Sequence, residues 1–563
     1  MLLSINTCPK GHVKGLKDLS SYVGIQSNVT LYLRAFRTSF FLEPLMLSLF
    51  SYWETKKGVN DQLRKNVTNG RIALAKNFQL FFLLGFEPFG VSFFPILSLA
   101  FLFYYAKQNA PKDTAGFFYL FGWFIFAGGL YWLYISIHIV SGAPSWLAII
   151  LICLLAAVMG IYYLITGFLI SLAFREFKSD FLVLIFIAPS IWALTEILRA
   201  YAITGFPWLT LGYSQINNFL VGWAPIGGVF MVSFITALIS SLLLLIIIKK
   251  RPYLVISCLF IIISASFFLR SVEWTESMDE EYSVALVQGG VDQEKKWLRS
   301  EFLKTLDLYR DALIGLENTN IVIWPEVSIP AISSNVESYL KELEVILKQK
   351  NIDLLLLGIN TRDQNGKVYN SVISLGNDQI TYNKRHLVPF GEYFPVPDSI
   401  RSWMREMRLP SNDIARGSNS QVMPKVDGIF LSISICYEDI FGSEIIDFLP
   451  ASNVLVNATN NAWFGRSIAS AQHFQMSRMR AIETGRYLLR STNTGITAIV
   501  KPDGKVQQQL KPFQYSVLKD VFVPMRGSTP YSNYGDLFCL ILSILIMTLG
   551  SFIGMLRLKN KNA

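Results

Sequence analysis

The chain has 563 residues, of which 52% are hydrophobic and 16% charged, and its formal net charge is +10. So apolar a composition excludes an ordinary soluble protein and indicates one that spans a membrane several times. The basic residues lie mainly in short loops and in the C-terminal tail, where membrane proteins carry them, and we find no signal for a nucleic-acid partner.

Residues 1–73 form an N-terminal extension of unknown role. Within it, the apolar stretch "LYLRAFRTSFFLEPLMLSLFSYW" contains Arg34, Arg37 and Glu43, which argue against a membrane span. The extension does not resemble a signal peptide, because no basic start leads into an uncharged core. We interpret it as an interfacial helix or as a start that was assigned too early.

Apolar runs after this extension predict about eight transmembrane helices. Most runs are close to the ~20 residues that cross a bilayer, and the first two are the shortest. The runs are 77–92, 93–107, 116–138, 146–173, 180–200, 222–248, 253–270 and 536–556. The transmembrane domain therefore covers 74–270, and 531–563 hold the last helix and a tail.

Charges in the connecting loops predict the orientation of these helices. Lys and Arg collect in every second connection, in "AKQNAPKD", "REFKSD", "KKRP" and the tail "LRLKNKN", whereas "VSGAPS" and "ITGFPWLTLGYSQINNF" have none. Because cytoplasmic loops carry the excess of basic residues, both termini are predicted to be cytoplasmic. The long polar segment 271–530 is then extracytoplasmic.

The segment 271–530 alternates short strand-like runs with helical ones. Runs such as "YSVALVQGG", "NIVIWPEVS", "DLLLLGIN", "IFLSISIC" and "NVLVNATN" predict buried strands. Residues 297–316, 333–349 and 468–484 have helical spacing. This order predicts an α/β domain whose sheets are covered by helices.

Three reactive side chains stand at the ends of predicted strands. Glu326 follows "IVIWP", Lys384 follows "ITYN", and Cys436 follows "SISI" as the one cysteine of the polar segment. A carboxylate can take the thiol proton while an ammonium stabilises the negative charge that develops during attack. The alternatives are an ordinary ion pair for Glu326 and Lys384, and an inert buried thiol for Cys436.

The surroundings of these residues resemble the nitrilase superfamily and, within it, the bacterial apolipoprotein N-acyltransferases. The matching stretches are "VQGGVDQEKKW", "IWPEVSIP", "NKRHLVPFGEYFP", "ICYEDIFG", "NATNNAWFG" and "QHFQMSRMRAIETGRYLLRSTNTGITAI". The membrane part matches too, in "TGFPWLTLGYSQ" and "WAPIGGV", so the resemblance extends over about 75–556. It implies an αββα sandwich for the polar domain.

The resemblance also implies roles for individual residues. Cys436 would be the nucleophile, Glu326 the general base, Lys384 the stabiliser of the oxyanion, and Glu392 a fourth residue that positions these three. Three further residues would line or gate an acyl pocket: Trp297, Tyr437 and Glu438. The alternative for Trp297 is a core aromatic, and we assign His386 and His473 structural roles.

The implied reaction transfers an acyl chain from a phospholipid to the α-amino group of a diacylglyceryl-cysteine at the N-terminus of an apolipoprotein. A thioester on Cys436 would be the intermediate, and no cofactor or metal motif is present. The protein would lie in the bacterial inner membrane, with its catalytic domain facing the periplasm and no nucleic acid as partner.

Two other interpretations remain open from the sequence. One is a membrane-anchored hydrolase of the same fold that acts on a nitrile or amide. The other is an inactive scaffold or transporter, which would place charged residues within the spans. Glu196 and Arg199 are such residues, although they lie near the end of a span, where they could instead contact lipid head groups.

Overall fold

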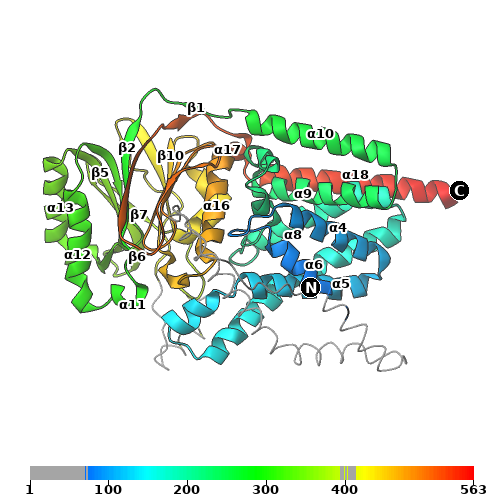
Figure 1. Cartoon of the computed structure of the whole chain (residues 1–563), viewed down its shortest axis with the longest axis horizontal. Helices are drawn as coiled ribbons and strands as arrows, with labels where there is room; N and C mark the ends of the chain where they lie inside the picture. Colours follow the sequence, from blue (N-terminus) through cyan, green and yellow to red (C-terminus); the bar gives the residue numbers. More distant parts are fainter. Residues whose placement is uncertain (1–69, 71–73, 394–398, 400–401, 403–413, 563) are drawn as a thin grey trace, which may run out of the picture. The chain divides into compact units, whose positions relative to one another are not determined.

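The computed structural model describes residues 70, 74–393, 399, 402 and 414–562, so the predicted N-terminal extension lies outside the described residues except for Gly70. Helices form the first half of the described chain and its C-terminal end (Figure 1). They are 74–83, α4 (Phe93–Gln108), α5 (Pro111–Gly129), η2 (Ile135–Val140), α6 (Ser145–Phe177), α7 (Asp180–Leu182), η3 (Val183–Ile187), α8 (Ala188–Tyr201), η4 (Leu211–Gln215), η5 (Phe219–Trp223), α9 (Ala224–Ile247), α10 (Pro252–Ser271) and α18 (Leu537–Asn562).

Five of the described helical segments are long and apolar enough to cross a membrane. They are Ser145–Phe177, Asp180–Tyr201, Phe219–Ile247, Pro252–Ser271 and Leu537–Asn560. All five overlap runs that the sequence predicts as spans. The total of eight stays a prediction, because the helices before Ser145 do not reach this measure.

The prediction of one continuous helix over 116–138 is wrong. Helix α5 begins earlier, at Pro111, and ends at Gly129, and a turn separates it from the π-helical segment η2. Two adjacent glycines, Gly128 and Gly129, close the helix while the apolar run continues beyond them. The run 77–92 likewise is helical only to residue 83.

Glu196 and Arg199 on α8 are buried, so the suggested contact with head groups is wrong. Arg199 donates to the carbonyl oxygens of Phe206 at 2.6 Å and Trp208 at 2.7 Å. Glu196 accepts from the backbone N–H of Leu211 at 2.9 Å. Both charged side chains therefore hold the loop that follows their own helix.

The polar segment contains two large sheets. The seven-stranded sheet has the order β14-β2-β3-β5-β6-β7, with β4 paired to β5, and the six-stranded sheet has the order β13-β12-β11-β10-β9-β8. The strands of the first are β2 (Tyr282–Gln288), β3 (Thr319–Ile323), β4 (Ile329–Ile332), β5 (Ile352–Arg362), β6 (Val368–Gly376), β7 (Thr381–Asn383) and β14 (Ser516–Phe522). Those of the second are β8 (Lys425–Val426), β9 (Ile429–Ile435), β10 (Val454–Thr459), β11 (Leu488–Thr492), β12 (Ala498–Val500) and β13 (Val506–Gln509). A separate pair joins β1 (Glu276–Ser277) to β15 (Met525–Arg526).

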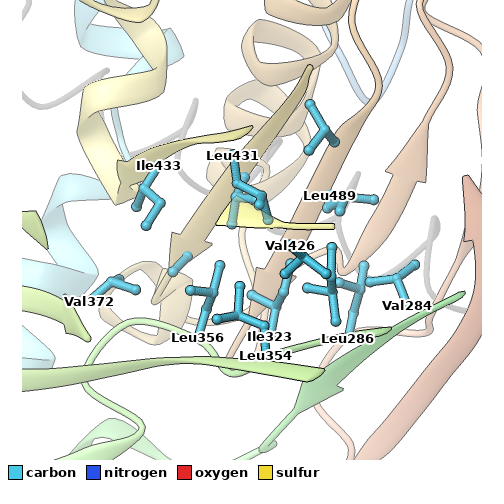
Figure 2. Packing of buried hydrophobic residues seen from close by; sticks show 14 of the residues in the cluster. Val284, Leu286, Ile323, Leu354, Leu356, Val372, Val426, Leu431, Ile433 and Leu489 are labelled. Carbon is cyan, nitrogen blue, oxygen red and sulfur yellow. The ribbon is translucent and has the colours of Figure 1, made fainter. Parts of the chain in front are cut away.

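Alternating side chains explain why the sheets stack. On β2, Val284 and Leu286 belong to the core between the two sheets, while Ala285 and Val287 face the helices. Figure 2 shows Val284 and Leu286 on the same side of that core as Leu354 and Leu356, with side chains of the other sheet opposite them. The opposite side includes Leu431, Ile433 and Leu489.

Helices cover the outer faces of both sheets, which confirms the predicted αββα sandwich (Figure 1). Helices α12 (Arg299–Ile314) and α13 (Glu337–Gln349) pack on the seven-stranded sheet, and α16 (Ala469–Thr484) packs on the other. The other short helices of the described residues lie in the connections between the larger elements: α11 (Gln293–Lys296), η6 (Ser333–Asn335), η7 (Cys436–Ile440), α15 (Gly442–Ile445), η8 (Ile446–Phe448), η9 (Asn461–Phe464) and α17 (Pro530–Tyr534).

Candidate active site

Both sheets contribute strand ends to one buried cluster. Glu326 follows β3, Lys384 directly follows β7, and Cys436 directly follows β9 in the opposite sheet. Their exposed fractions are 7%, 1% and 9%. The three residues that the sequence singles out are therefore all buried at strand ends, and their charges act on one another.

Lys384 lies between two carboxylates. Its Nζ is 3.4 Å from Oε1 of Glu326 and 2.9 Å from the carboxylate of Glu392. The side-chain amide of Asn370 on β6 donates to Glu326 at 2.8 Å and to Glu392 at 3.0 Å. A solvated surface ion pair does not have this arrangement, because here Lys384 and Glu326 are buried, Glu392 is partly buried, and every charge is hydrogen-bonded.

Electrostatics keep Lys384 charged. Burial alone would lower the pKa of Lys384, but the carboxylates of Glu392 and Glu326 outweigh burial and hold this pKa above its usual range. The ammonium is therefore a permanent positive charge near the thiol. Asn370, which sequence reasoning missed, fixes both carboxylates around it.

Cys436 is a thiol at rest rather than a thiolate. Burial and the nearby carboxylate of Glu326 raise the pKa of Cys436 to about 12, although Lys384 acts in the opposite direction. The backbone of Cys436 has a φ of 53°, in the left-handed region that non-glycine residues rarely adopt. Such strain is frequent where a fold presents a reactive side chain.

Glu438 holds the strained turn in place. Its carboxylate accepts from the backbone N–H of Ile435 at 2.6 Å, from the N–H groups of Arg385 and His386, and from the hydroxyl of Tyr382 at 3.1 Å. Burial raises the pKa of Glu438 to about 6. These contacts join the segment after β9 to the segment after β7, and the role of Glu438 in lining or gating an acyl pocket stays a prediction.

Tyr437 and Trp297 occupy different environments. Tyr437 is buried beside Cys436 and packs edge-on against His386 and Phe441, with ring centroids 5.7 and 5.2 Å apart. Trp297 follows α11 and is 55% exposed, so it is not the core aromatic of the alternative interpretation. His386 contacts the carboxylate of Glu444 at 2.7 Å, in line with its assigned structural role.

A buried polar network lies behind the nucleophile. His473 on α16 has Nε2 2.7 Å from Oδ1 of Asp439, and its Nδ1 faces N–H groups of Arg490 at 3.1 Å and Asn461 at 3.2 Å. Since both neighbours of Nδ1 are donors, Nε2 carries the proton of a neutral ring. Burial also lowers the pKa of His473. His473 thus anchors the turn three residues beyond Cys436.

Sequence reasoning missed a second lysine at the cluster. Lys296 is 3% exposed, and its Nζ donates to the backbone carbonyl of Glu326 at 3.2 Å. Burial lowers its pKa to about 8, against the charges of Glu326 and Cys436. The available signal was its place in "VQGGVDQEKKW", directly before Trp297.

Comparisons with known proteins agree with this architecture. Residues 80–242 match the model of the apolipoprotein N-acyltransferase N-terminal domain, and residues 283–519 match that of carbon-nitrogen hydrolases. The apolipoprotein N-acyltransferase of Methylococcus capsulatus is 36% identical over 80% of this chain and 90% of its own length. Those of Nitrosomonas europaea and Vibrio parahaemolyticus are each 34% identical, over 83% and 80% of this chain and 94% and 91% of their own lengths. The chain therefore belongs to the apolipoprotein N-acyltransferase family.

Proposed function

We propose that this protein transfers an acyl chain from a phospholipid to the α-amino group of the N-terminal diacylglyceryl-cysteine of apolipoproteins. One observation carries the proposal: a strained, buried thiol ends β9 beside a carboxylate and a lysine, in a chain of this family. The thiol is Cys436, the carboxylate Glu326 and the lysine Lys384.

In the first half-reaction, Glu326 takes the proton of the Cys436 thiol as the sulfur attacks the ester carbonyl of the phospholipid. A base is required at that moment because the thiol is protonated at rest. The S–C bond forms, the C–O bond to glycerol breaks, and the proton on Glu326 passes to the leaving oxygen. The products are a lysophospholipid and a thioester.

In the second half-reaction, the α-amino nitrogen of the acceptor attacks the thioester carbonyl. The N–C bond forms, the C–S bond breaks, and the proton that the amine loses returns through Glu326 to the sulfur. An amide is more stable than a thioester, so this step needs no other energy source. The enzyme is restored with its thiol protonated.

Lys384 stabilises the negative charge that develops on the carbonyl oxygen in both steps. Its ammonium is already charged and fixed by Glu326 and Glu392, so little reorganisation is needed when the charge develops. Glu392 positions Lys384 and leaves Glu326 free to exchange the proton. Tyr437 and the exposed Trp297 are candidates for contact with the acyl chain.

The membrane supplies both substrates in this proposal. Residues 74–270 and 531–563 would form the transmembrane parts, and residues 271–530 the catalytic domain on the periplasmic face of the inner membrane. The alternation of basic loops supports this orientation. Five apolar helices support membrane insertion itself.

Intact-protein mass spectrometry tests the proposal. After mixing with phospholipid, the protein should gain the mass of one acyl chain, and Cys436→Ala should gain none. Addition of a diacylated lipopeptide should remove the added mass and yield a triacylated peptide. An inactive scaffold would never gain the mass, and a hydrolase would lose it to water whether or not the peptide is present.

A further inference from the structure

Two adjacent lysines of α11 differ sharply in environment. Lys295 is exposed and forms a surface ion pair with Asp292 at 2.8 Å. Lys296 is buried, and its Nζ donates to the carbonyl oxygen of Glu326 at 3.2 Å. The mechanism above does not use Lys296, although burying an ammonium is costly unless a negative charge compensates it.

Amide side chains hold α11 so that Lys296 stays inside. Asn493 accepts from the N–H of Val291 at 3.0 Å and donates to the carbonyl oxygen of the same residue at 2.7 Å. Asn460 donates to the side chain of Gln293 at 2.8 Å. The segment that enters α11 is therefore tied to the loops after β10 and β11, which fixes the position of Lys296.

The charges of the cluster balance only when Lys296 is included. Glu326 and Glu392 contribute two negative charges, and Lys384 contributes one positive charge. In the described part of the chain, the ion pairs of this cluster are those of Lys384 alone, and none includes Lys296. The ammonium of Lys296 brings the net charge of these four side chains from minus one to zero.

We propose that Lys296 is a positioning residue for the general base: it holds the Glu326 backbone, and its positive charge acts on the carboxylate and the thiol between which the Cys436 proton moves. This inference rests on the proposed function. The titratable groups that act on Lys296 are Glu326 and Cys436, and Lys384 and Glu392 complete the cluster. Because the pKa of Lys296 is lowered to about 8, its charge should be lost just above neutral pH.

The test compares Lys296→Met, Lys296→Gln and the matched control Lys295→Met in the full chain. Two rates are measured from pH 6 to 10: acylation of Cys436 by phospholipid, and alkylation of Cys436 by iodoacetamide, followed by peptide mass spectrometry. Alkylation requires no lipid, so it remains informative even if the proposed acyl transfer fails. Melting temperatures in detergent report folding.

We expect Lys296→Met to acylate at least tenfold more slowly than wild type at pH 7, and to be alkylated more slowly as well. Its melting temperature should change little, because the flexible Met side chain fills the same space and the carboxylates of Glu326 and Glu392 keep the ammonium of Lys384 as a partner. The difference in rate should close above pH 9, where Lys296 of the wild type is neutral. Lys295→Met should behave like wild type.

Three results would overturn the inference. One is a wild-type acylation rate in Lys296→Met at pH 7. Another is a loss of rate that is equal at every pH and accompanied by a lower melting temperature, which indicates a purely structural role. The third is full activity in Lys296→Gln, which keeps a hydrogen-bond donor for the Glu326 carbonyl but has no charge.

Discussion

At the scale of single residues, the site depends on charges that are buried together. Lys384 is 1% exposed between Glu326 and Glu392, so each charged group is compensated by its neighbours rather than by water. Glu326, Lys384 and Cys436 could be identified from the sequence because each follows a strand-like run and lies in a stretch that resembles the family. Asn370 could not, because a buried amide has no sequence pattern of its own, and the only signal for Lys296 was its place in "VQGGVDQEKKW".

Substitutions at Glu326 and Lys384 should test the role of general base and the role of oxyanion stabiliser separately. Glu326→Gln should block thioester formation, and Lys384→Arg should fail too, since a planar guanidinium cannot replace a compact ammonium at this buried position. Loss of an oxyanion donor costs about 2.7–4 kcal/mol of barrier, roughly a hundred- to a thousandfold in rate. The measurement is the rate of acyl-enzyme formation in variants that are shown to fold. A near-normal rate of thioester formation in Lys384→Arg would show that a positive charge alone suffices to stabilise the oxyanion.

Because the Cys436 thiol is protonated at rest, its rate of alkylation should depend on pH. Since burial raises the pKa of Cys436 to about 12, the thiolate fraction should keep rising with pH between 6 and 9, about tenfold for each pH unit except near pH 8, where Lys296 loses its charge. Alkylation of Cys436 should follow that slope without a plateau. A plateau near pH 7 to 8 would indicate a preformed thiolate paired with Lys384, and Glu326 would then not be needed to remove the proton.

At the scale of elements, short continuous apolar runs were the most useful sequence signal for strands. The runs that contain β2, β5 and β9 were predicted because their apolar side chains fill both faces of a covered sheet. The end of α5 was not predicted, because aromatic residues continue the hydropathic run past Gly129. The network of Asp439, His473 and Arg490 was also missed, since its members are far apart in sequence and meet only through packing.

Helix α9 is interrupted where it meets the sandwich. Gly227 and Gly228 have non-helical backbone angles, and the freed N–H of Val229 donates to Glu483 on α16 at 2.8 Å. A Cβ at Gly228 would lie 2.3 Å from the ring of Tyr531. The interruption of α9 therefore requires glycine at position 228, where a side chain would meet the ring of Tyr531.

Gly228→Ala should therefore destabilise the protein more than the same substitution at a matched glycine, Gly142. Gly142 has nearly the same positive φ, 72° against 70°, but nothing lies within 4 Å of its Cβ position. Both alanine variants place a side chain at positive φ, and only Gly228→Ala adds overpacking, which typically costs about 1–3 kcal/mol. Melting temperatures in detergent check this, and equal losses in the two variants would show that Tyr531 moves aside freely.

At the scale of the whole molecule, membrane helices and sandwich are joined by buried hydrogen bonds. The side-chain oxygen of Gln472 on α16 accepts from the indole N–H groups of Trp132 at 3.2 Å and Trp208 at 2.9 Å. The residue after Gln472 is His473, which supports the nucleophile turn. Composition predicted the membrane part, and the order of strand-like and helical runs predicted the α/β part, but neither predicted these contacts between them.

Orientation is the prediction that belongs to the whole molecule. A reporter that is active only in the periplasm should work when fused after Gly366, in the exposed turn between β5 and β6, and fail after Lys250. The reason is that Lys249, Lys250 and Arg251 form a basic loop that favours the cytoplasm. The reverse pattern would place the catalytic domain in the cytoplasm and separate it from periplasmic lipoproteins.

A single-turnover transfer tests the central claim most directly. The enzyme is loaded from phospholipid with an isotopically labelled acyl chain, freed of lipid, and mixed with a diacylated lipopeptide. The account predicts that the label leaves Cys436 and appears, at the same rate, in an amide at the α-amino group of the peptide. Release of the label as free fatty acid at a rate that the peptide does not change would contradict acyl transfer, and a label that never resides on Cys436 would contradict the assigned nucleophile.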